Sequence, residues 1–140
     1  LIRKTRGADA ALVAVEKFAR NNWWHIDAAV ACGKLYAEKN DFAKAEEAFK
    51  HASRLDVHDV TALNQSALLR VNQKRFDEAY AIQCRAIARQ PDEPRQYLIL
   101  SDILEKMGRG EEARAALAQV QHLQALAKTQ APVSGDLLAN

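Results

Sequence analysis

The sequence is poor in residues that interrupt helices, with three prolines and five glycines among 140 residues. Their scarcity favours long helices that are joined by short connections. Hydrophobic residues make up 49% of the chain and charged residues 27%. This balance is typical of a chain that folds around a hydrophobic core and excludes a disordered one. The length suits a single domain.

An excess of charge of one sign is also missing, since 20 basic residues face 18 acidic ones. The net charge of +2 gives no electrostatic basis for nucleic-acid binding. No apolar run approaches the roughly 18 residues of a membrane span, so we expect no membrane insertion. The two cysteines, Cys32 and Cys84, form no CxxC pair, which favours a cytoplasmic location. A targeting sequence upstream of Leu1 is left open, because the chain does not begin with methionine.

An internal repeat of 34 residues runs through most of the chain. At this offset, segment 40–45 aligns with 74–79 and then with 108–113. Two columns of small residues keep the same phase, namely Ala45, Ala79 and Ala113, and Gly33, Ala67 and Ser101. Apolar residues within 26–39 and within 42–55 recur at helical spacing. Each period therefore predicts two helices, and stacked pairs of this kind bury a continuous core.

One set of residues stands at the spacings of a small, aromatic, alanine, aromatic, alanine signature: Gly33, Tyr36, Ala45, Phe49 and Ala52. In this set, and in a closing proline at Pro91, the chain resembles the tetratricopeptide-repeat family. The resemblance implies an all-α fold, a right-handed superhelical solenoid of antiparallel helix pairs. Its three units span 26–59, 60–93 and 94–127. The middle unit departs most, since Arg70 and Gln83 stand where larger apolar residues are usual.

The two ends of the chain fall outside these three units. Residues 1–25 align with the second half of an earlier, degenerate unit, whose helix we expect at about 8–21. The chain thus begins within a repeat, which indicates a fragment of a longer protein or a vestigial first helix. The last helix of the third unit is expected to run long, from Gly110 to Lys128, and to cap the array. Residues 128–140 are expected to form a tail.

No pattern in the sequence indicates catalysis, a metal or a cofactor. The four histidines follow no metal-binding spacing: His25, His51, His58 and His122. Cys32 falls on the apolar stripe of its helix, as a core residue would, and not as a nucleophile. We therefore expect a protein that is not an enzyme.

In the family that the chain resembles, the first helix of each unit lines a concave groove. The residues beside the core stripe of these helices are therefore the predicted binding residues. They are Asp27, Val30, Lys34, Thr61, Asn64, Gln65, Leu68, Arg95, Leu98 and Asp102. Their mixture of charges, amides and aliphatic groups suits a peptide or helix of a partner protein.

Trp23 and Trp24 are the one unusual pair in the sequence. Either a ring packs into the junction before the helix at 26–39, which is the favoured interpretation, or an exposed ring anchors a partner.

Three functions are compatible with the sequence. The first is a non-catalytic interaction scaffold that binds a partner's peptide or helix in the concave groove. The second is an accessory or substrate-positioning module of a larger enzyme or assembly. The third is self-association, as a homo-oligomer, through the apolar ends of the repeat array. The first is favoured, although fold resemblance alone does not name the partner.

The sequence also predicts one ligand that the groove does not bind. A subtype of the family grips the carboxyl-terminal tail of chaperones with a Lys, Asn, Asn, Lys, Arg clamp. The matching positions here are Val30, Lys34, Gln65, Arg95 and Ile99. Only Arg95 keeps a charge in its place, so calorimetric titration with a peptide ending in Glu-Glu-Val-Asp should show no binding. Micromolar binding of that peptide would overturn the prediction.

Overall fold

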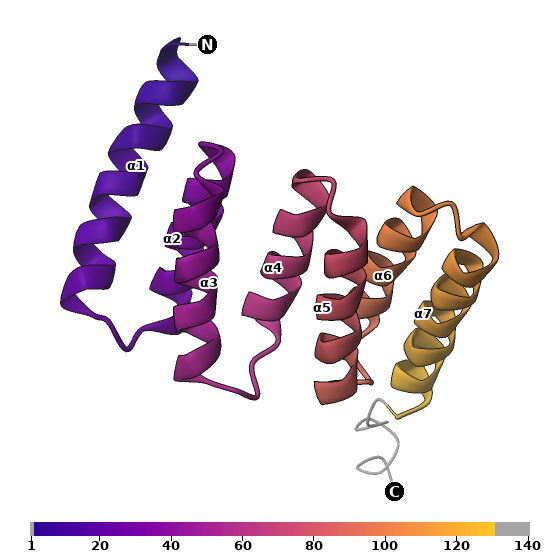
Figure 1. Cartoon of the computed structure of the whole chain (residues 1–140). Coiled ribbons are helices and arrows are strands. Elements are labelled where there is room, and N and C mark those ends of the chain that lie inside the picture. The colour runs from indigo at the N-terminus through magenta and orange to yellow at the C-terminus, as the bar shows by residue number, and fades with distance from the viewer. Residues whose placement is uncertain (1, 131–140) are drawn as a thin grey trace, which may run out of the picture.

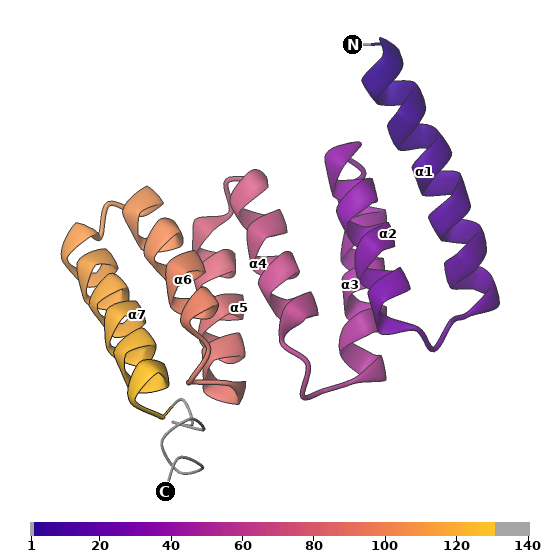
Figure 2. The same ribbon diagram turned by 180° about the vertical axis from the view of Figure 1, so that it is seen from behind.

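Every regular element in residues 2–130, the part of the chain that a computed structural model describes, is an α-helix. Seven helices follow one another in a row, each antiparallel to the one before (Figures 1 and 2). They are α1 (Ile2–Asn21), α2 (Ile26–Glu38), α3 (Phe42–Leu55), α4 (Thr61–Asn72), α5 (Phe76–Arg89), α6 (Pro94–Lys106) and α7 (Gly110–Gln130). The predicted all-α solenoid is confirmed. Residues 131–140 of the predicted tail lie outside the described residues, and 128–130 belong to α7.

The 34-residue period of the sequence appears again in the backbone of the turns after α2, α4 and α6. Asn40, Lys74 and Gly108 adopt positive φ angles of 61°, 59° and 76°. Across each turn a backbone N–H donates to a carbonyl of the preceding helix. The pairs are Asp41 to Tyr36 (2.9 Å), Arg75 to Arg70 (2.8 Å) and Arg109 to Leu104 (2.9 Å). This left-handed closure caps each helix and reverses the chain at the same point of each pair.

The sequence predicts Asp41 and Asp92 as helix caps and places Pro94 in the first turn of a helix. Asp41 caps α3 by accepting a backbone N–H of the first turn at 3.4 Å, as its position predicts. Pro94 occupies the first turn of α6, also as predicted. The cap of α6, however, is Glu93, whose carboxylate accepts the N–H of Arg95 at 3.3 Å. The prediction of Asp92 is wrong because that residue lies one position too far from the helix.

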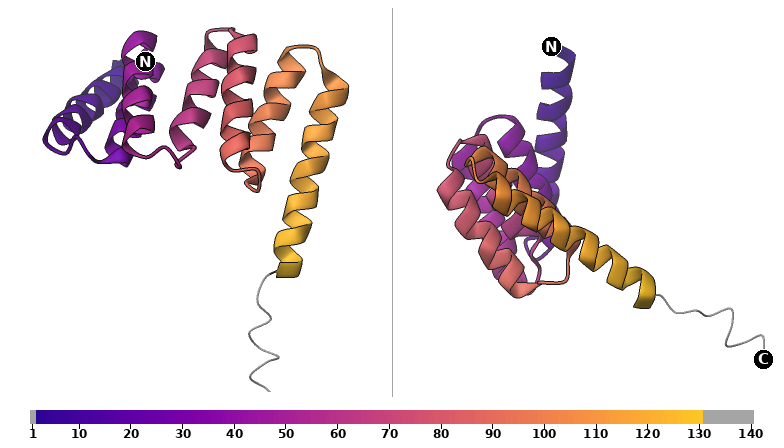
Figure 3. Two further views of the ribbon diagram at one scale, coloured as in Figure 1. Left: turned by 60° about the horizontal axis from the view of Figure 1, so that its bottom comes forward. Right: turned by 90° about the vertical axis from the view of Figure 1, so that its right-hand side faces the viewer.

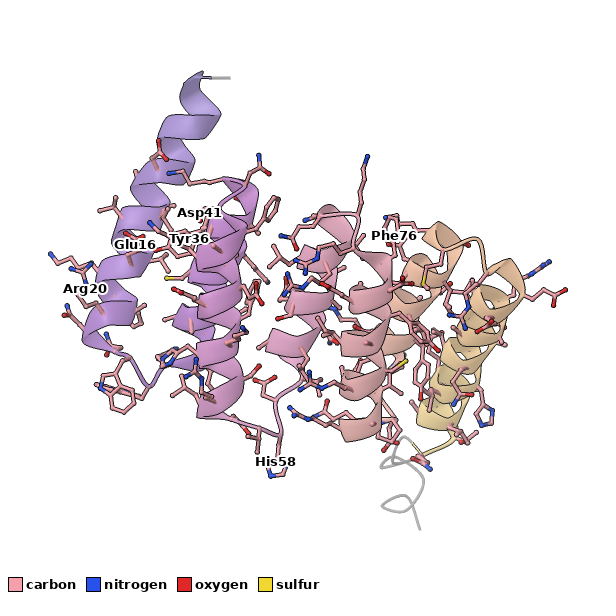
Figure 4. The ribbon with its side chains drawn as sticks, in the orientation of Figure 1. Glu16, Arg20, Tyr36, Asp41, His58 and Phe76 are labelled. Atoms are coloured by element: carbon pink, nitrogen blue, oxygen red, sulfur yellow. The ribbon has the colours of Figure 1, made fainter. Side chains whose placement is uncertain are left out.

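The first helix, α1, begins at Ile2, earlier than the predicted start at residue 8. A single glycine, Gly7, does not end it, because an isolated glycine costs a helix only about 1 kcal/mol. The hydroxyl of Tyr36 on α2 donates a hydrogen bond to the carboxylate of Glu16 on α1 (Figure 4). Burial, together with this bond and the charge of Glu16, raises the pKa of Tyr36, so the hydroxyl stays a donor at neutral pH.

α2 and α3 pack closely where Gly33 meets Phe49. The ring of Phe49 is 1% exposed and lies directly against the backbone of Gly33. A Cβ at position 33 would lie well inside van der Waals contact with that ring, which is why this position needs glycine. Ala67 is the corresponding residue of α4 and is fully buried. The small residues of this column thus let the helices of a pair pack closely.

A buried amide replaces the aromatic ring in the middle pair. Gln83 on α5, fully buried, stands 34 residues after Phe49. Its Nε2 donates to Oδ1 of Asn64 on α4 (3.2 Å) and to the backbone carbonyl of Gln96 on α6 (2.9 Å). The amide therefore links two helix pairs by hydrogen bonds through its Nε2, whereas its buried Oε1 has no partner among the described residues.

Arg70 is the other residue of the middle pair that departs from the family pattern, and it also links neighbouring pairs. Its side chain is 12% exposed and lies between α3 and α5. Its guanidinium contacts the carboxylates of Glu46 on α3 (2.5 Å) and Glu78 on α5 (3.4 Å). The polar residues that interrupt the family pattern therefore hold neighbouring pairs together.

The left-handed turns generate a paired prediction on stability. Lys74→Gly should raise the free energy of unfolding by about 0.5–1 kcal/mol, because glycine adopts positive φ without steric cost. Gly108→Ala should lower it by about 1 kcal/mol for the same reason. No atom lies within 4 Å of a Cβ at 108, so only backbone strain contributes. Urea denaturation measures both changes, and two shifts of the same sign would contradict the explanation.

The buried amide generates a second prediction. Gln83→Leu should lower the free energy of unfolding by about 1–3 kcal/mol, because Oδ1 of Asn64 loses its donor inside the core. Adding Asn64→Leu should restore part of that loss, since it removes the orphaned acceptor. A double-mutant cycle in urea measures the coupling. Additive losses in the double variant would show that the bond does not join the two residues energetically.

Candidate functional site

The inner edge of the helix row is formed by α2, α4 and α6. Along this edge α2 contacts α4, and α4 contacts α6. The opposite helices spread apart, because α3 and α5 make no such contact, although both are fully described. A row that is closer on one side curves toward that side. The first helices of the pairs therefore form the concave face, as the predicted groove requires.

Three predicted binding residues lie together on this face. A hollow of about 400 Å³ opens between α2 and α4. Its lining residues are Lys34, Ala37, Glu38, Phe49, Gln65, Leu68, Leu69 and Asn72. Lys34, Gln65 and Leu68 are the predicted ones. The hollow thus offers a cation, a carboxylate, two amides and aliphatic surface within one site, which suits a peptide of mixed character.

The predicted residues of α6 continue the exposed surface. Arg95, Leu98 and Asp102 are all exposed on this helix. Leu98 is 47% exposed, which is high for a leucine. Asp102 forms an ion pair with Lys106 at 3.2 Å. The apolar side chain of Leu98 thus lies between the charged residues Arg95 and Asp102 on the accessible surface of α6.

The remaining four predicted residues divide into two groups. Asp27 is exposed and Thr61 is half-buried. Val30 and Asn64 are 6% and 5% exposed, so little of either side chain is accessible to a ligand. α4 is contacted by α2, α3, α5 and α6, which leaves only a narrow stripe of its surface uncovered. Asn64 points to Gln83 from within this packing, and Val30 belongs to the core around Phe49.

The tryptophan pair lies at the turn between α1 and α2. Trp23 is 63% exposed and Trp24 is 57% exposed. Their rings meet edge to face, with centroids 5.9 Å apart. The favoured interpretation, in which one ring fills the junction, is therefore wrong. The turn is held instead by its backbone, since the carbonyl of Trp23 lies 2.7 Å from Nε2 of His51. Both rings remain accessible as an anchor.

Titratable side chains form no metal-binding cluster in the described residues. Within 2–130, no three His, Cys, Asp or Glu side chains gather as metal ligands would. Cys32 is buried, and burial, with a smaller effect of Glu16, raises the pKa of its thiol. A raised thiol pKa makes the thiolate scarce. Over the same residues, no helix combines the length and hydropathy that crossing a bilayer demands.

A basic hollow on the opposite side of the row was missed by the sequence analysis. It has a volume of about 490 Å³ and opens between α3 and α5, with α4 beneath. Its charged lining consists of Glu46, Lys50, Arg54, Arg70, Arg85 and Arg89. In the sequence these cations are interleaved with acids and resemble a solvated surface. Only the folded spacing of α3 and α5 brings them together.

The comparisons with known proteins agree with this geometry. The family model described as "Tetratricopeptide repeat" matches residues 26–56. No curated protein matches the sequence. A solved structure named "MamA MSR-1 C2" is 20% identical with a TM-score of 0.69, and the match covers 89% of this chain and 71% of that one.

Other solved structures with the same protein name are equally similar in shape. "Crystal structure of MamA" is 17% identical with a TM-score of 0.73, over 87% of this chain and 71% of that chain. "MamA AMB-1 P212121" is 21% identical with a TM-score of 0.64, over 96% and 71%. At these identities the similarity concerns the fold alone. Residues 26–56 thus match a tetratricopeptide repeat, and the described chain shares the helical solenoid fold of these solved structures.

Proposed function

We propose that this chain is a non-catalytic scaffold that binds a peptide or helix of a partner protein along its concave face. The observation that carries the proposal is the hollow between α2 and α4, where Lys34, Gln65 and Leu68 lie together. The fold supports an interaction role, because tetratricopeptide-repeat solenoids expose an extended curved surface. The contacts that such a ligand would make come from the first helices of the pairs.

The charges on this face describe the ligand further. Lys34 and Glu38 line the hollow, and Arg95 and Asp102 lie exposed on α6. With both signs present, the face favours a ligand that carries both acidic and basic groups. Leu68 and Leu98 supply apolar contacts, so one or two aliphatic side chains of the ligand would anchor it.

The division of the chain into repeats is part of the proposal. α2 packs closely with α3, α4 with α5, and α6 with α7, in the units 26–59, 60–93 and 94–127. α1 packs on α2 as α3 packs on α4, which supports its assignment as the second helix of an earlier unit. On α1, Leu12 is buried on the α2 side, whereas Ala11 is exposed.

Self-association through the ends of the row is the second candidate. On α1, Val13 is 64% exposed and Phe18 is 49% exposed. On α7, Leu117 and Leu126 are 37% and 40% exposed. Apolar side chains at both ends of the row would favour contact between copies. Sedimentation velocity at several concentrations distinguishes this role, because a scaffold for another protein keeps its sedimentation coefficient.

Peptides selected from a displayed library against the chain provide the test of the concave face. The variant Lys34→Glu with Leu98→Arg should weaken their binding about tenfold or more. The first substitution reverses a charge, and the second replaces the apolar side chain of Leu98 with a charged one. Fluorescence anisotropy measures the dissociation constants. Both side chains are exposed, so circular dichroism should show an unchanged helical content.

The matched control makes the same two substitutions on α7, as Leu117→Arg with Lys128→Glu. These residues are also exposed and belong to α7, which is not one of the three helices that form the concave face. The control should bind the selected peptides within about twofold of the parent chain. Equal losses in both variants, or an unchanged affinity in the concave variant, would exclude the concave face as the binding site.

A further inference from the structure

Two hollows on the outer side of the row are related by the 34-residue repeat. Outer hollow 1 lies between α1 and α3, and outer hollow 2 is the basic hollow between α3 and α5. Nine of the twelve lining residues of each hollow correspond at an offset of 34. Such pairs include Arg20 and Arg54, Trp23 and Val57, Ala29 and Leu63, Tyr36 and Arg70, and His51 and Arg85. Outer hollow 2 is therefore built by the repeat itself.

The two hollows differ in charge. Outer hollow 1 contains two Lys or Arg side chains, Arg20 and Lys44, and the carboxylate of Glu16. Outer hollow 2 contains five Lys or Arg side chains and one carboxylate, that of Glu46. The same backbone framework thus carries a strong positive charge in one unit and a nearly balanced one in the other. This contrast points to a ligand that is specific to outer hollow 2.

The single carboxylate of outer hollow 2 is already engaged. Glu46 contacts Arg70 at 2.5 Å and Lys50 at 3.3 Å. Burial alone raises its pKa, but the hydrogen bond and charge of Arg70, aided by Lys50, outweigh burial and leave the pKa below its usual value. Glu46 is therefore ionised at neutral pH and neutralises only part of the cluster.

Three arginines around outer hollow 2 have no acidic partner among residues 2–130. Arg54, Arg85 and Arg89 form no ion pair there, and all three are exposed. Arg89 donates to the carbonyl of Val57 at 3.0 Å, and Arg54 to that of Lys50 at 3.4 Å. These bonds hold two guanidiniums near the hollow while leaving most of their N–H groups available to a ligand.

The bottom of outer hollow 2 is apolar. It includes Leu63 and Leu69, which are 6% and 2% exposed, and the half-buried Ile82. Val57, 57% exposed, lies at one end, in the loop that also carries His58 (Figure 4). A ligand made of charge alone would leave this surface uncovered. The arrangement suits a segment in which an aliphatic side chain lies between carboxylates.

We propose that outer hollow 2 binds an acidic segment of a partner protein. An aliphatic side chain of that segment packs on Leu63, Leu69 and Ile82, and its carboxylates pair with Arg54, Arg85 and Arg89. Guanidinium and carboxylate match in planar, two-bonded geometry, which gives both charge and direction to the contact. The site lies on the side opposite the concave face, so the chain can hold two partners at once. This assignment does not depend on the concave site.

A designed probe tests the assignment. A fluorescein-labelled peptide that alternates glutamate and leucine is titrated with the full chain, and anisotropy gives the dissociation constant. Arg85→Glu with Arg89→Glu should weaken binding about tenfold or more, because two attractive contacts become repulsive. Arg54→Glu alone should weaken it about threefold or more. All three side chains are exposed, so circular dichroism should show that the helices remain.

The matched control reverses two exposed cations on α7, as Arg114→Glu with Lys128→Glu. It changes the net charge by the same amount and should alter the affinity by less than about twofold at 0.15 M salt. A larger loss in this control than in Arg85→Glu with Arg89→Glu would overturn the proposal, because the peptide would then bind outside outer hollow 2. A loss of equal size would also overturn it, by showing a non-specific charge effect.

Two further measurements define the ligand. The same peptide with glutamine in place of glutamate should bind at least about tenfold more weakly, and equal binding would refute a role for carboxylates. Duplex DNA and phosphatidylserine vesicles are titrated in parallel. Should either bind more tightly than the peptide, and lose that binding in Arg85→Glu with Arg89→Glu, the occupant is not an acidic protein segment.

Discussion

The left-handed turn that closes α2, α4 and α6 is the constraint on which the rest of the structure depends. It recurs at Asn40, Lys74 and Gly108, three different residues forced into one conformation. Because the chain reverses at the same position in each unit, the second helices begin at residues 42, 76 and 110. The position of this turn sets how the two helices of each pair lie against each other. The contact of Gly33 with Phe49, the concave face and the two outer hollows all depend on it.

Much of this fold could be predicted from the sequence, because the apolar pattern within each helix and the 34-residue repeat predict the same helix pairs. The apolar stripes define the helices, and the column of Gly33, Ala67 and Ser101 gives their phase. The start of α1 could not be predicted, since Gly7 interrupts a helix weakly and no proline marks the boundary. Glu93 was missed as a cap because aspartate is the commoner capping residue and Asp92 stands next to it.

The exposure of individual side chains was harder to predict, because it depends on how many neighbours cover a helix. A helical face at the spacing i, i+3, i+7 selects Asn64 and Leu68 together, yet α4 has four helical neighbours and Asn64 lies beneath them. The role of the two polar residues in the middle unit could not be predicted either. Gln83 and Arg70 stand where larger apolar residues are usual, yet each bonds to residues of other helices. A single sequence does not show such long-range partners.

The last helix has a mechanical consequence. Ala113, Ala116 and Val120 of α7 are buried, but nine of the ten residues from 121 to 130 are exposed. Figure 3 shows this end of α7 extending past the row. At 1.5 Å per residue, ten helical residues span about 15 Å. Because α7 continues as one helix, it places Gln130 about 15 Å beyond Val120, the last buried residue of the array.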